Sequence, residues 1–246
     1  MITKDNNEIR IYGENACLAV FNKRPQDIIQ FFLTKEKIGQ YPHIAKYLAE
    51  QKRAYHIVSR EEIDKMTKAT HHEDVCMLVK KKATRSLVQY LFSNPVNSVL
   101  VALENVSNPH NVGAIIRSAA HFGANGVILI GGASPDAASA IRTSEGGSEY
   151  LEIFEEKNFQ KALEQLNKHK FQIITTSPRA SLSLYDVKWE NKVVIVLGEE
   201  ATGLSKEVLS AGTSIKIPGT DQVESLNVSV ASAVMLSEIY RQVKIK

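Results

Sequence analysis

The chain has 246 residues, more than one average domain needs, so one small and one larger compact unit are the default expectation. Its 43% hydrophobic and 23% charged residues, with a net charge of only +3, exclude disordered and fibrous classes. The opening segment is charged, and apolar runs such as VIVLG fall far short of the roughly 20 residues of a membrane span, so we expect neither export nor a membrane anchor.

Short helical and strand-like patterns alternate between residues 9 and 80. Helical spacing occurs in ENACLAVFNKR, HIAKYLAEQK and SREEIDKM, and strand-like runs occur in DIIQFFLT, AYHIV and DVCMLVK. Ser59 and Glu62 have the spacing of a capping box, which predicts that a helix begins there. This alternation predicts a small α/β sandwich domain over residues 1–80.

A basic and polar stretch, KKKATRSLVQYLFSNPVNS, follows this segment and ends in turn-forming residues. We expect residues 81–96 to form a basic linker. The first 80 residues carry 13 basic and 11 acidic groups, the linker adds three basic groups, and the remainder carries 14 basic and 16 acidic groups. The positive excess favours a polyanionic partner reached through the first third, although a solvated surface without a partner gives the same pattern.

Longer units resume at Val99 and continue toward the end of the chain. Near-continuous apolar strands are predicted in VLVAL, VILI, FQIITT, VVIVLG and SIKIP, each followed by turn or helix signals. Strands of this kind, separated by helices, indicate a parallel sheet that is covered on both faces. Residues 97–246 are therefore expected to form one larger α/β domain.

The segment ENVSNPHN leads into a predicted helix. Asn108 suits the N-cap, Pro109 the first turn, and Gly123 the end of this helix. One face is an apolar stripe, formed by Val112, Ile115, Ile116, Ala119 and Phe122. The opposite face carries His110, Arg117 and His121, either as a solvated surface or as part of a site.

Two further segments place polar groups at the ends of apolar elements. A buried strand ends at Gly198 and is followed by Glu199 and Glu200, at the edge where open α/β sheets bind ligands. Two such glutamates are also common at a helix start. Ser225 and Asn227 precede an Ala- and Ser-rich helix, predicted from about residue 225 to 241, that is too apolar to face water; N-capping is their alternative role.

Familiar cofactor signatures do not occur in the sequence. It contains no GxGxxG after a strand, no GxxxxGK[ST], no GxSxG elbow and no HExxH spacing, which argues against dinucleotide reductases, P-loop NTPases, hydrolases and zinc enzymes. Cys17 and Cys76 stand far apart in the sequence, so neither a disulfide framework nor a cysteine metal site is expected. A reducing, cytoplasmic compartment fits this pattern best.

The three polar segments resemble, in order, the three motifs of the SpoU (TrmH) branch of the SPOUT RNA 2′-O-ribose methyltransferases. The matching stretches are NVSNPHNVGAIIRSA, VLGEEATGLS and IPGTDQVESLNVSVASAV. Residues 9–80 are similar to the small substrate-binding domain that often precedes this catalytic domain. The resemblance implies a parallel-sheet SPOUT-like domain with a C-terminal trefoil knot, preceded by a small α/β sandwich. It also implies a homodimer and an rRNA or tRNA substrate.

The resemblance further implies which residues form the site. The catalytic set is Asn111, Arg117, Glu200, Ser225 and Asn227. The S-adenosylmethionine-binding set is Thr176, Leu197, Gly198, Glu199, Ile217, Ser225 and Leu226. No metal belongs to either set. The expected reaction is methyl transfer from S-adenosylmethionine to a ribose 2′-hydroxyl.

Arg117 needs a role that suits a guanidinium, which stays charged in proteins. We therefore expect it to bind the adjacent phosphate and to stabilise developing alkoxide charge rather than to act as a simple base. Three departures from the family pattern stand out: Ala201 in place of glycine, an altered loop at 219–222, and Glu73-Asp74 in place of a Gln-Gly pair. The altered loop motivates the alternative of a catalytically silent RNA-binding paralogue.

Overall fold

A computed structural model of the chain describes residues 7–220 and 222–243. The first domain contains β1 (Glu8–Tyr12), α1 (Glu14–Lys23), η1 (Pro25–Asp27), β2 (Ile28–Leu33), η2 (Lys35–Gln40), α2 (Pro42–Glu50), β3 (Ala54–Ile57), α3 (Arg60–Thr67) and β4 (Val75–Lys80). The remainder contains α4 (Leu87–Phe92), β5 (Ser98–Glu104), α5 (Pro109–His121), β6 (Gly126–Ile130), α6 (Ala138–Ser144), η3 (Gly147–Glu149), β7 (Glu152–Glu156), α7 (Phe159–Lys168), β8 (Gln172–Thr176), β9 (Leu182–Ser183), η4 (Leu184–Asp186), β10 (Lys192–Gly198), α8 (Lys206–Leu209), β11 (Thr213–Lys216) and α9 (Val228–Val243).

The first sheet has the strand order β1-β4-β2-β3, with β3 parallel to β2 and the other pairs antiparallel. Helices α1 and α2 bury one face of this sheet, and α3 covers part of the other. The helices and strands predicted in this region are confirmed. The capping box is also confirmed, because Ser59 Oγ accepts from the Glu62 amide and the Glu62 carboxylate accepts from the Ser59 amide.

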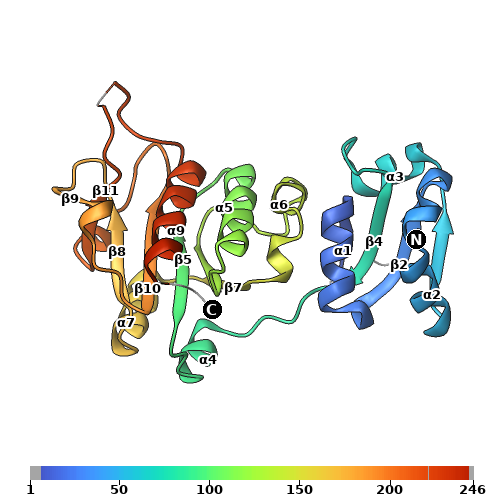
Figure 1. Cartoon of the computed structure of the whole chain (residues 1–246), viewed down its shortest axis with the longest axis horizontal. Coiled ribbons are helices and arrows are strands. Elements are labelled where there is room, and N and C mark those ends of the chain that lie inside the picture. Colours follow the sequence, from blue (N-terminus) through green and yellow to red (C-terminus); the bar gives the residue numbers. More distant parts are fainter. Residues whose placement is uncertain (1–6, 221, 244–246) are drawn as a thin grey trace.

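The second sheet has the order β7-β6-β5-β10-β8-β11-β9, and every pair is parallel. Figure 1 shows this sheet on the left and the small domain on the right. The predicted fold class, an α/β chain whose larger domain has a parallel sheet, is confirmed. The trefoil knot implied by the family resemblance stays a prediction.

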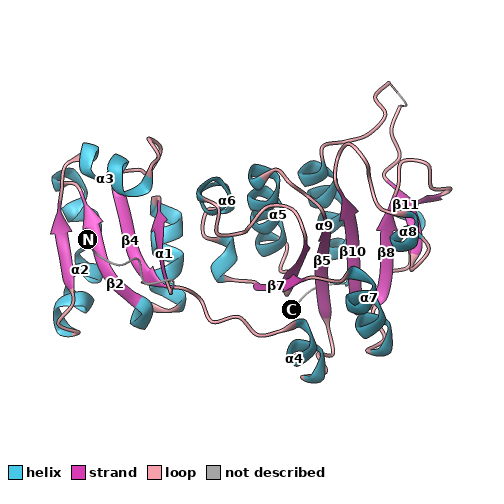
Figure 2. Ribbon diagram, turned by 180° about the vertical axis from the view of Figure 1, so that it is seen from behind, coloured by secondary structure: helices cyan, strands magenta, loops and turns pink. Residues whose placement is uncertain are grey.

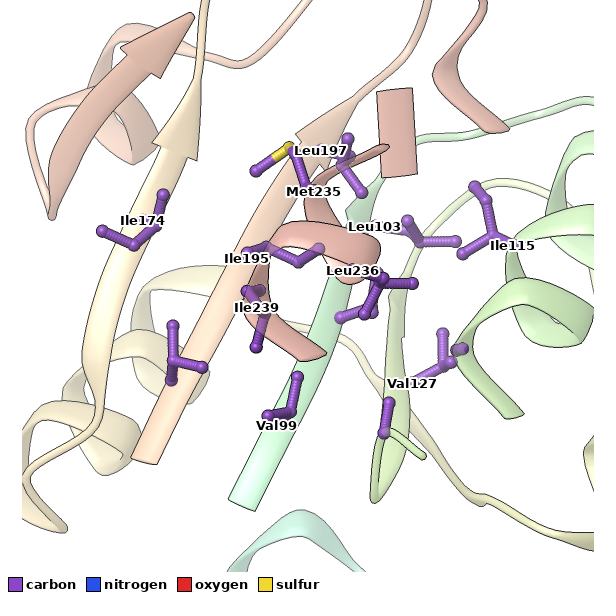
Figure 3. Packing of buried hydrophobic residues seen from close by; sticks show 14 of the residues in the cluster. Val99, Leu103, Ile115, Val127, Ile174, Ile195, Leu197, Met235, Leu236 and Ile239 are labelled. Carbon is purple, nitrogen blue, oxygen red and sulfur yellow. The ribbon is translucent and has the colours of Figure 1, made fainter. Parts of the chain in front are cut away.

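Alternation along each strand sends side chains to two separate cores. On β5, Val99, Val101 and Leu103 face α5 and α9, as Figure 3 shows for the residues around Ile195, while Leu100 and Ala102 face α4, α7 and α8. Because both faces are covered, each strand must be apolar along its whole length. This requirement explains why these strands are the clearest elements in the sequence.

Helix α5 follows the predicted pattern closely. Asn108 Oδ1 accepts from the His110 amide at 2.9 Å, and Gly123 lies beyond the last turn with φ of 72°. The predicted apolar stripe faces the core. The polar face, including Arg117, is exposed to solvent.

The connector differs from the expected linker. Residues 81–86 are extended, but Ser86 and Gln89 form a second capping box that starts α4. Leu87 and Leu91 of this short helix are buried against the large sheet. The sequence analysis did not predict the edge strands β1 and β7; in β7, three of the five residues are glutamates and the apolar run is short.

In the part of the chain that the structure describes, no helix combines the length and the apolar character needed to cross a bilayer.

Gly113 provides a test of how tightly α5 packs on α6. A Cβ at this position would lie 2.5 Å from the Ala140 carbonyl oxygen and 2.8 Å from Thr143 Cβ. We expect Gly113→Ala to lower the free energy of unfolding by about 1–3 kcal/mol, because overpacking outweighs the better helix propensity of alanine. Urea unfolding followed by Trp189 fluorescence measures the change. Gly219→Ala is the control, since its added methyl meets no atom within 4 Å; equal midpoints for both variants would contradict this packing.

Candidate functional site

Parallel pairing brings the three polar segments to one edge of the large sheet. The arrowheads of β5, β10 and β8 point the same way in Figure 2, and Glu104 at the end of β5 is level with Gly198 at the end of β10. The segments that follow these strands therefore leave the sheet side by side. Residues separated by about a hundred positions in the sequence meet at this edge.

Asn111, Glu200 and Asn227 form one hydrogen-bonded cluster at this edge. Glu200 Oε1 accepts from Asn111 Nδ2 at 2.8 Å and from Asn227 Nδ2 at 2.6 Å. The two asparagines also contact each other, because Asn227 Nδ2 lies 3.2 Å from Asn111 Oδ1. Each of the three motifs thus contributes one member, and two amide donors fix the orientation of the carboxylate.

Asn227 also starts α9. Its Oδ1 accepts from the Ser229 amide at 2.9 Å, which caps the helix, while its Nδ2 donates to Glu200. The capping role considered for Ser225 and Asn227 therefore belongs to Asn227, and α9 begins at Val228 rather than near residue 225. Because capping orients the amide, local helix formation and the site geometry depend on the same side chain.

A cavity of about 640 Å³ lies beside this cluster. All seven residues predicted to bind the cofactor line it: Thr176, Leu197, Gly198, Glu199, Ile217, Ser225 and Leu226. Glu200 also lines the cavity and so connects it to the asparagine cluster. Ser225 faces this cavity and makes no hydrogen bond to the cluster within the described residues.

The loop after β10 closes tightly on itself at the cavity. Glu199 and Gly203 form an isolated antiparallel bridge, with the Gly203 amide donating to the Glu199 carbonyl at 2.8 Å. A Cβ on Gly198 would lie 2.4 Å from the Gly203 carbonyl carbon and 2.6 Å from the Leu204 nitrogen. Only glycine at position 198 leaves room for residues 203 and 204 to approach this closely. The need for space therefore explains why the strand ends in glycine.

Two carboxylates hold this loop, and only Glu199 was among the predicted site residues. Glu104 accepts from both the amide and the hydroxyl of Ser205, at 2.9 and 2.8 Å. Glu199 accepts from the Ser107 hydroxyl at 2.7 Å. Ser107 lies within the first motif and Glu104 directly precedes it, but their partners became evident only from the strand pairing.

Arg117 is the one predicted catalytic residue that lies neither in the asparagine cluster nor on the cavity wall. It lies on α5 six residues after Asn111, which turns its side chain about 240° around the helix axis and about 9 Å along it. The side chain is exposed and does not line the cavity. Within a single chain, Arg117 therefore points away from Glu200.

The cavity suits S-adenosylmethionine in size and in lining chemistry. Small-molecule sites commonly have volumes of roughly 300–1,000 Å³ and combine apolar walls with a few polar groups. Here Leu197, Ile217 and Met235 give apolar wall, while the backbone at Gly198 approaches closely. The charged residues around the cavity, which suit a ligand that carries both an ammonium and a carboxylate, are Arg179, Lys216, Glu199, Glu200 and Glu224. Of these, the sequence analysis missed Arg179, Lys216 and Glu224.

Gly198→Ala should weaken S-adenosylmethionine binding at least about tenfold, because the added methyl forces the loop after β10 away from its present position. Isothermal titration calorimetry gives the dissociation constant directly. Gly219→Ala is again the matched control, since it lines the same cavity with open space around its Cα. Unchanged affinity for Gly198→Ala would mean that this loop does not shape the cofactor site.

Comparisons with known proteins agree with this geometry. Residues 98–237 match the model of the SpoU rRNA Methylase family, and residues 10–85 match a model described as RNA 2′-O ribose methyltransferase substrate binding. A protein of Escherichia coli O157:H7, named uncharacterized tRNA/rRNA methyltransferase YfiF, is 36% identical over 238 residues, covering 96% of this chain and 69% of that protein. The 23S rRNA (guanosine-2′-O-)-methyltransferase RlmB of Pasteurella multocida is 29% identical over 240 residues, covering 94% of this chain and 97% of the relative.

Solved structures share the fold. The crystal structure of an AdoMet-bound rRNA methyltransferase from Sinorhizobium meliloti superposes with a TM-score of 0.81 at 22% identity, over 96% of this chain and 88% of the other. The resemblance predicted from the three motifs is thereby confirmed. The chain belongs to the SpoU rRNA methylase family, with a substrate-binding domain preceding the methylase domain.

Proposed function

We propose that this protein transfers the methyl group of S-adenosylmethionine to a ribose 2′-hydroxyl of rRNA or tRNA. Family membership makes it an S-adenosylmethionine-dependent RNA 2′-O-ribose methyltransferase. The observation that carries the proposal is the meeting of Asn111, Glu200 and Asn227 beside a cavity of cofactor size. The RNA class is taken from the names of the relatives, which act on ribosomal or transfer RNA.

A ribose hydroxyl is a weak nucleophile, so the site must orient its oxygen and favour loss of its proton. Bound in the cavity, the cofactor supplies an electrophilic methyl group on a sulfonium. Glu200 is held by two amide donors on Oε1, and in this fixed orientation it can accept a hydrogen bond from the ribose. Ser225 lines the cavity close to the cluster in sequence and serves to orient the cofactor.

Arg117 supplies positive charge for the phosphate and for the developing alkoxide in this proposal. Since it points away from the cavity of its own chain, it would act on a cavity from a second copy of the protein. A guanidinium stabilises an anionic oxygen by charge-assisted hydrogen bonds without changing its own protonation. The active unit is accordingly a homodimer.

Exposed apolar side chains on α9, the helix that packs on α5, support the dimer. On α9, Val230 is 48% exposed and Tyr240 is 51% exposed, although this helix is among the most apolar in the chain. The Tyr240 ring lies 6.2 Å from the ring of Phe122, at the end of α5. A patch that spans α5 and α9 is suited to burial against an identical patch.

A cytoplasmic location is part of the same proposal. Cys17 and Cys76 are both free thiols, as expected in a reducing compartment. Ribosomal and transfer RNA are available to a modifying enzyme in that compartment. The silent-paralogue alternative predicts no measurable binding of S-adenosylmethionine, so calorimetry on the wild-type protein separates the two functions.

Arg117→Ala should lower kcat by more than tenfold, equivalent to more than about 1.4 kcal/mol of transition-state stabilisation, while cofactor affinity stays unchanged. The reason is that Arg117 contacts neither the cavity nor the core in its own chain. Methyl incorporation into total RNA from a strain lacking the gene measures kcat, and calorimetry measures binding. A comparable loss of cofactor affinity would identify Arg117 as a structural residue instead.

Mixing two impaired variants tests whether Arg117 acts across the dimer, at a concentration of S-adenosylmethionine that saturates the wild type but leaves Gly198→Ala largely unoccupied. In a heterodimer of Arg117→Ala with Gly198→Ala, one site combines an intact cavity with the partner's intact arginine. We expect activity to recover toward a quarter of the wild-type value after subunit exchange, since about half of the dimers are mixed and each has one complete site. Absence of recovery in mixtures that do form heterodimers would place the arginine in the site of its own chain.

Val230→Glu should convert the protein from a dimer into a monomer, because it places a charge in the apolar patch. Sedimentation at low micromolar concentration should give twice 27.3 kDa for the wild type and 27.3 kDa for the variant. Glu164→Gln, an exposed change on α7, is the control. A wild-type protein that sediments only at 27.3 kDa would contradict the dimer.

A further inference from the structure

The two domains meet through a defined interface. Helix α1 of the small domain lies against α6 and η3 of the methylase domain (Figure 1). Ile141 of α6 is 8% exposed and belongs to the hydrophobic core of the small domain. Tyr12 Oη donates to the Ala138 carbonyl at 2.9 Å, and Asn15 Nδ2 donates to Glu145 at 2.9 Å. The small domain therefore shares part of its core with its neighbour.

A buried ion pair lies within this interface. Arg24 donates from Nε to Glu149 Oε2 at 2.8 Å and from Nη2 to Glu149 Oε1 at 3.0 Å. The two side chains are only 8% and 5% exposed. Arg24 also donates to the Lys80 carbonyl, so its guanidinium joins α1, the end of β4 and η3. A buried, bidentate pair has strict geometry, and without Glu149 the Arg24 guanidinium keeps only the more distant Asp27 carboxylate, at 3.5 Å, as a charged partner in the described part of the chain.

Each of the three basic side chains of the connector contacts the methylase domain. Lys82 Nζ lies 3.0 Å from the Ser148 carbonyl oxygen and 2.7 Å from that of Leu151, and burial lowers the pKa of Lys82. Lys81 pairs with Asp136, and Arg85 pairs with Glu152. Of the three connector cations, Lys82 therefore holds the two domains together, whereas the pairs of Lys81 and Arg85 are partly exposed to solvent.

The segment held by Arg24 and Lys82 lies directly on the helix that carries Arg117. A Cβ on Gly147 would lie 3.1 Å from the Ile116 carbonyl oxygen and 3.2 Å from Arg117 Cα. On its other side, Gly146 lies so close to α1 that a Cβ there would be 2.6 Å from Ala19 Cβ. Residues 146–149 are thus packed between α1 and the backbone of α5 at Arg117.

We propose that Glu149 is a positioning residue for methyl transfer: through its buried pair with Arg24 it locks the RNA-binding domain onto the methylase domain and fixes η3 against α5 at Arg117. The inference rests on the proposed role of Arg117. If the two domains are locked together, RNA bound by the small domain reaches the cavity edge of the large sheet in one fixed geometry, which makes the choice of ribose specific. A protein with a loosely tethered domain would accept a range of distances between the bound RNA and the reactive ribose.

A second contact supports this lock. Glu73 accepts from the Glu14 amide at the start of α1 and lies 3.7 Å from Arg142 of α6. This carboxylate therefore ties α1 to the methylase domain at a second place.

The first test measures the separation of the domains in the full-length protein. Spin labels on cysteines that replace exposed Lys46 in α2 and Glu164 in α7 report a distance distribution by pulsed electron resonance. The native cysteines are buried, and burial raises the pKa of Cys76 to about 12 and that of Cys17 as well, so they should not react. We expect one narrow distribution for the wild type and a clearly broader one for Glu149→Ala.

The second test measures catalysis with the same variants and with Glu149→Gln, a milder change. We expect kcat at saturating RNA to fall by about ten- to a hundredfold, since small misplacements of reacting groups carry penalties of this size. The Kd for S-adenosylmethionine should be unchanged, and thermal unfolding should show that both domains remain folded. Glu152→Gln is the control, because its pair with Arg85 is about a third exposed and should matter little.

The outcomes separate cleanly. A broad distribution together with reduced kcat supports the positioning role. A narrow distribution in Glu149→Ala, or a broad distribution with wild-type kcat, overturns it. If the wild type binds S-adenosylmethionine and methylates no RNA, the proposed function fails. In that case the distance distribution still decides whether Glu149 locks the domains.

Discussion

The pairing of β5 with β10 is the contact on which the rest of the structure depends. Their register runs from Ser98 opposite Lys192 to Glu104 opposite Gly198 without a break. Both strands are buried on both faces, so a shift of one residue would exchange the side chains of the two cores. The hydrophobic pattern therefore fixes the register, and the register fixes which loop residues face each other at the sheet edge.

Polar residues at that edge have two functions each, one local and one long-range. Asn227 caps α9 and holds Glu200, and Glu104 ends β5 while it binds the loop after β10 through Ser205. Because the same side chains stabilise a helix or strand and hold the site, the geometry of the site depends on the stability of those helices and strands. This arrangement also gives the site rigidity, because each group is held by an element whose position is set by packing.

The small domain affects RNA recognition through its position on the methylase domain as well as through its own surface. Its connector and α1 place basic groups against carbonyls and carboxylates of the methylase domain, so the charge excess of the first third is partly neutralised inside the molecule. Formal charge along the sequence is therefore a poor guide to the field that RNA meets. The basic side chains that remain available to RNA are those on the exposed faces of the small domain and along α5.

The sequence alone determined the class of fold, the buried strands, the main amphipathic helices and the three motif segments, because these depend on periodicity, capping and local residue types. The motif resemblance also indicated seven residues that line the cavity, such as Gly198 and Leu226, but not Glu224 or Arg179. The sequence did not reveal β7, whose edge position relieves it of the need to be apolar, nor the helix within the connector. Only the tertiary structure decided that Asn111 and Asn227 share one oxygen of Glu200, that Arg117 faces away from them, and that Arg24 meets Glu149. The physical reason is that each of these contacts joins residues far apart in the chain, and their distances follow from strand register and domain packing rather than from local pattern.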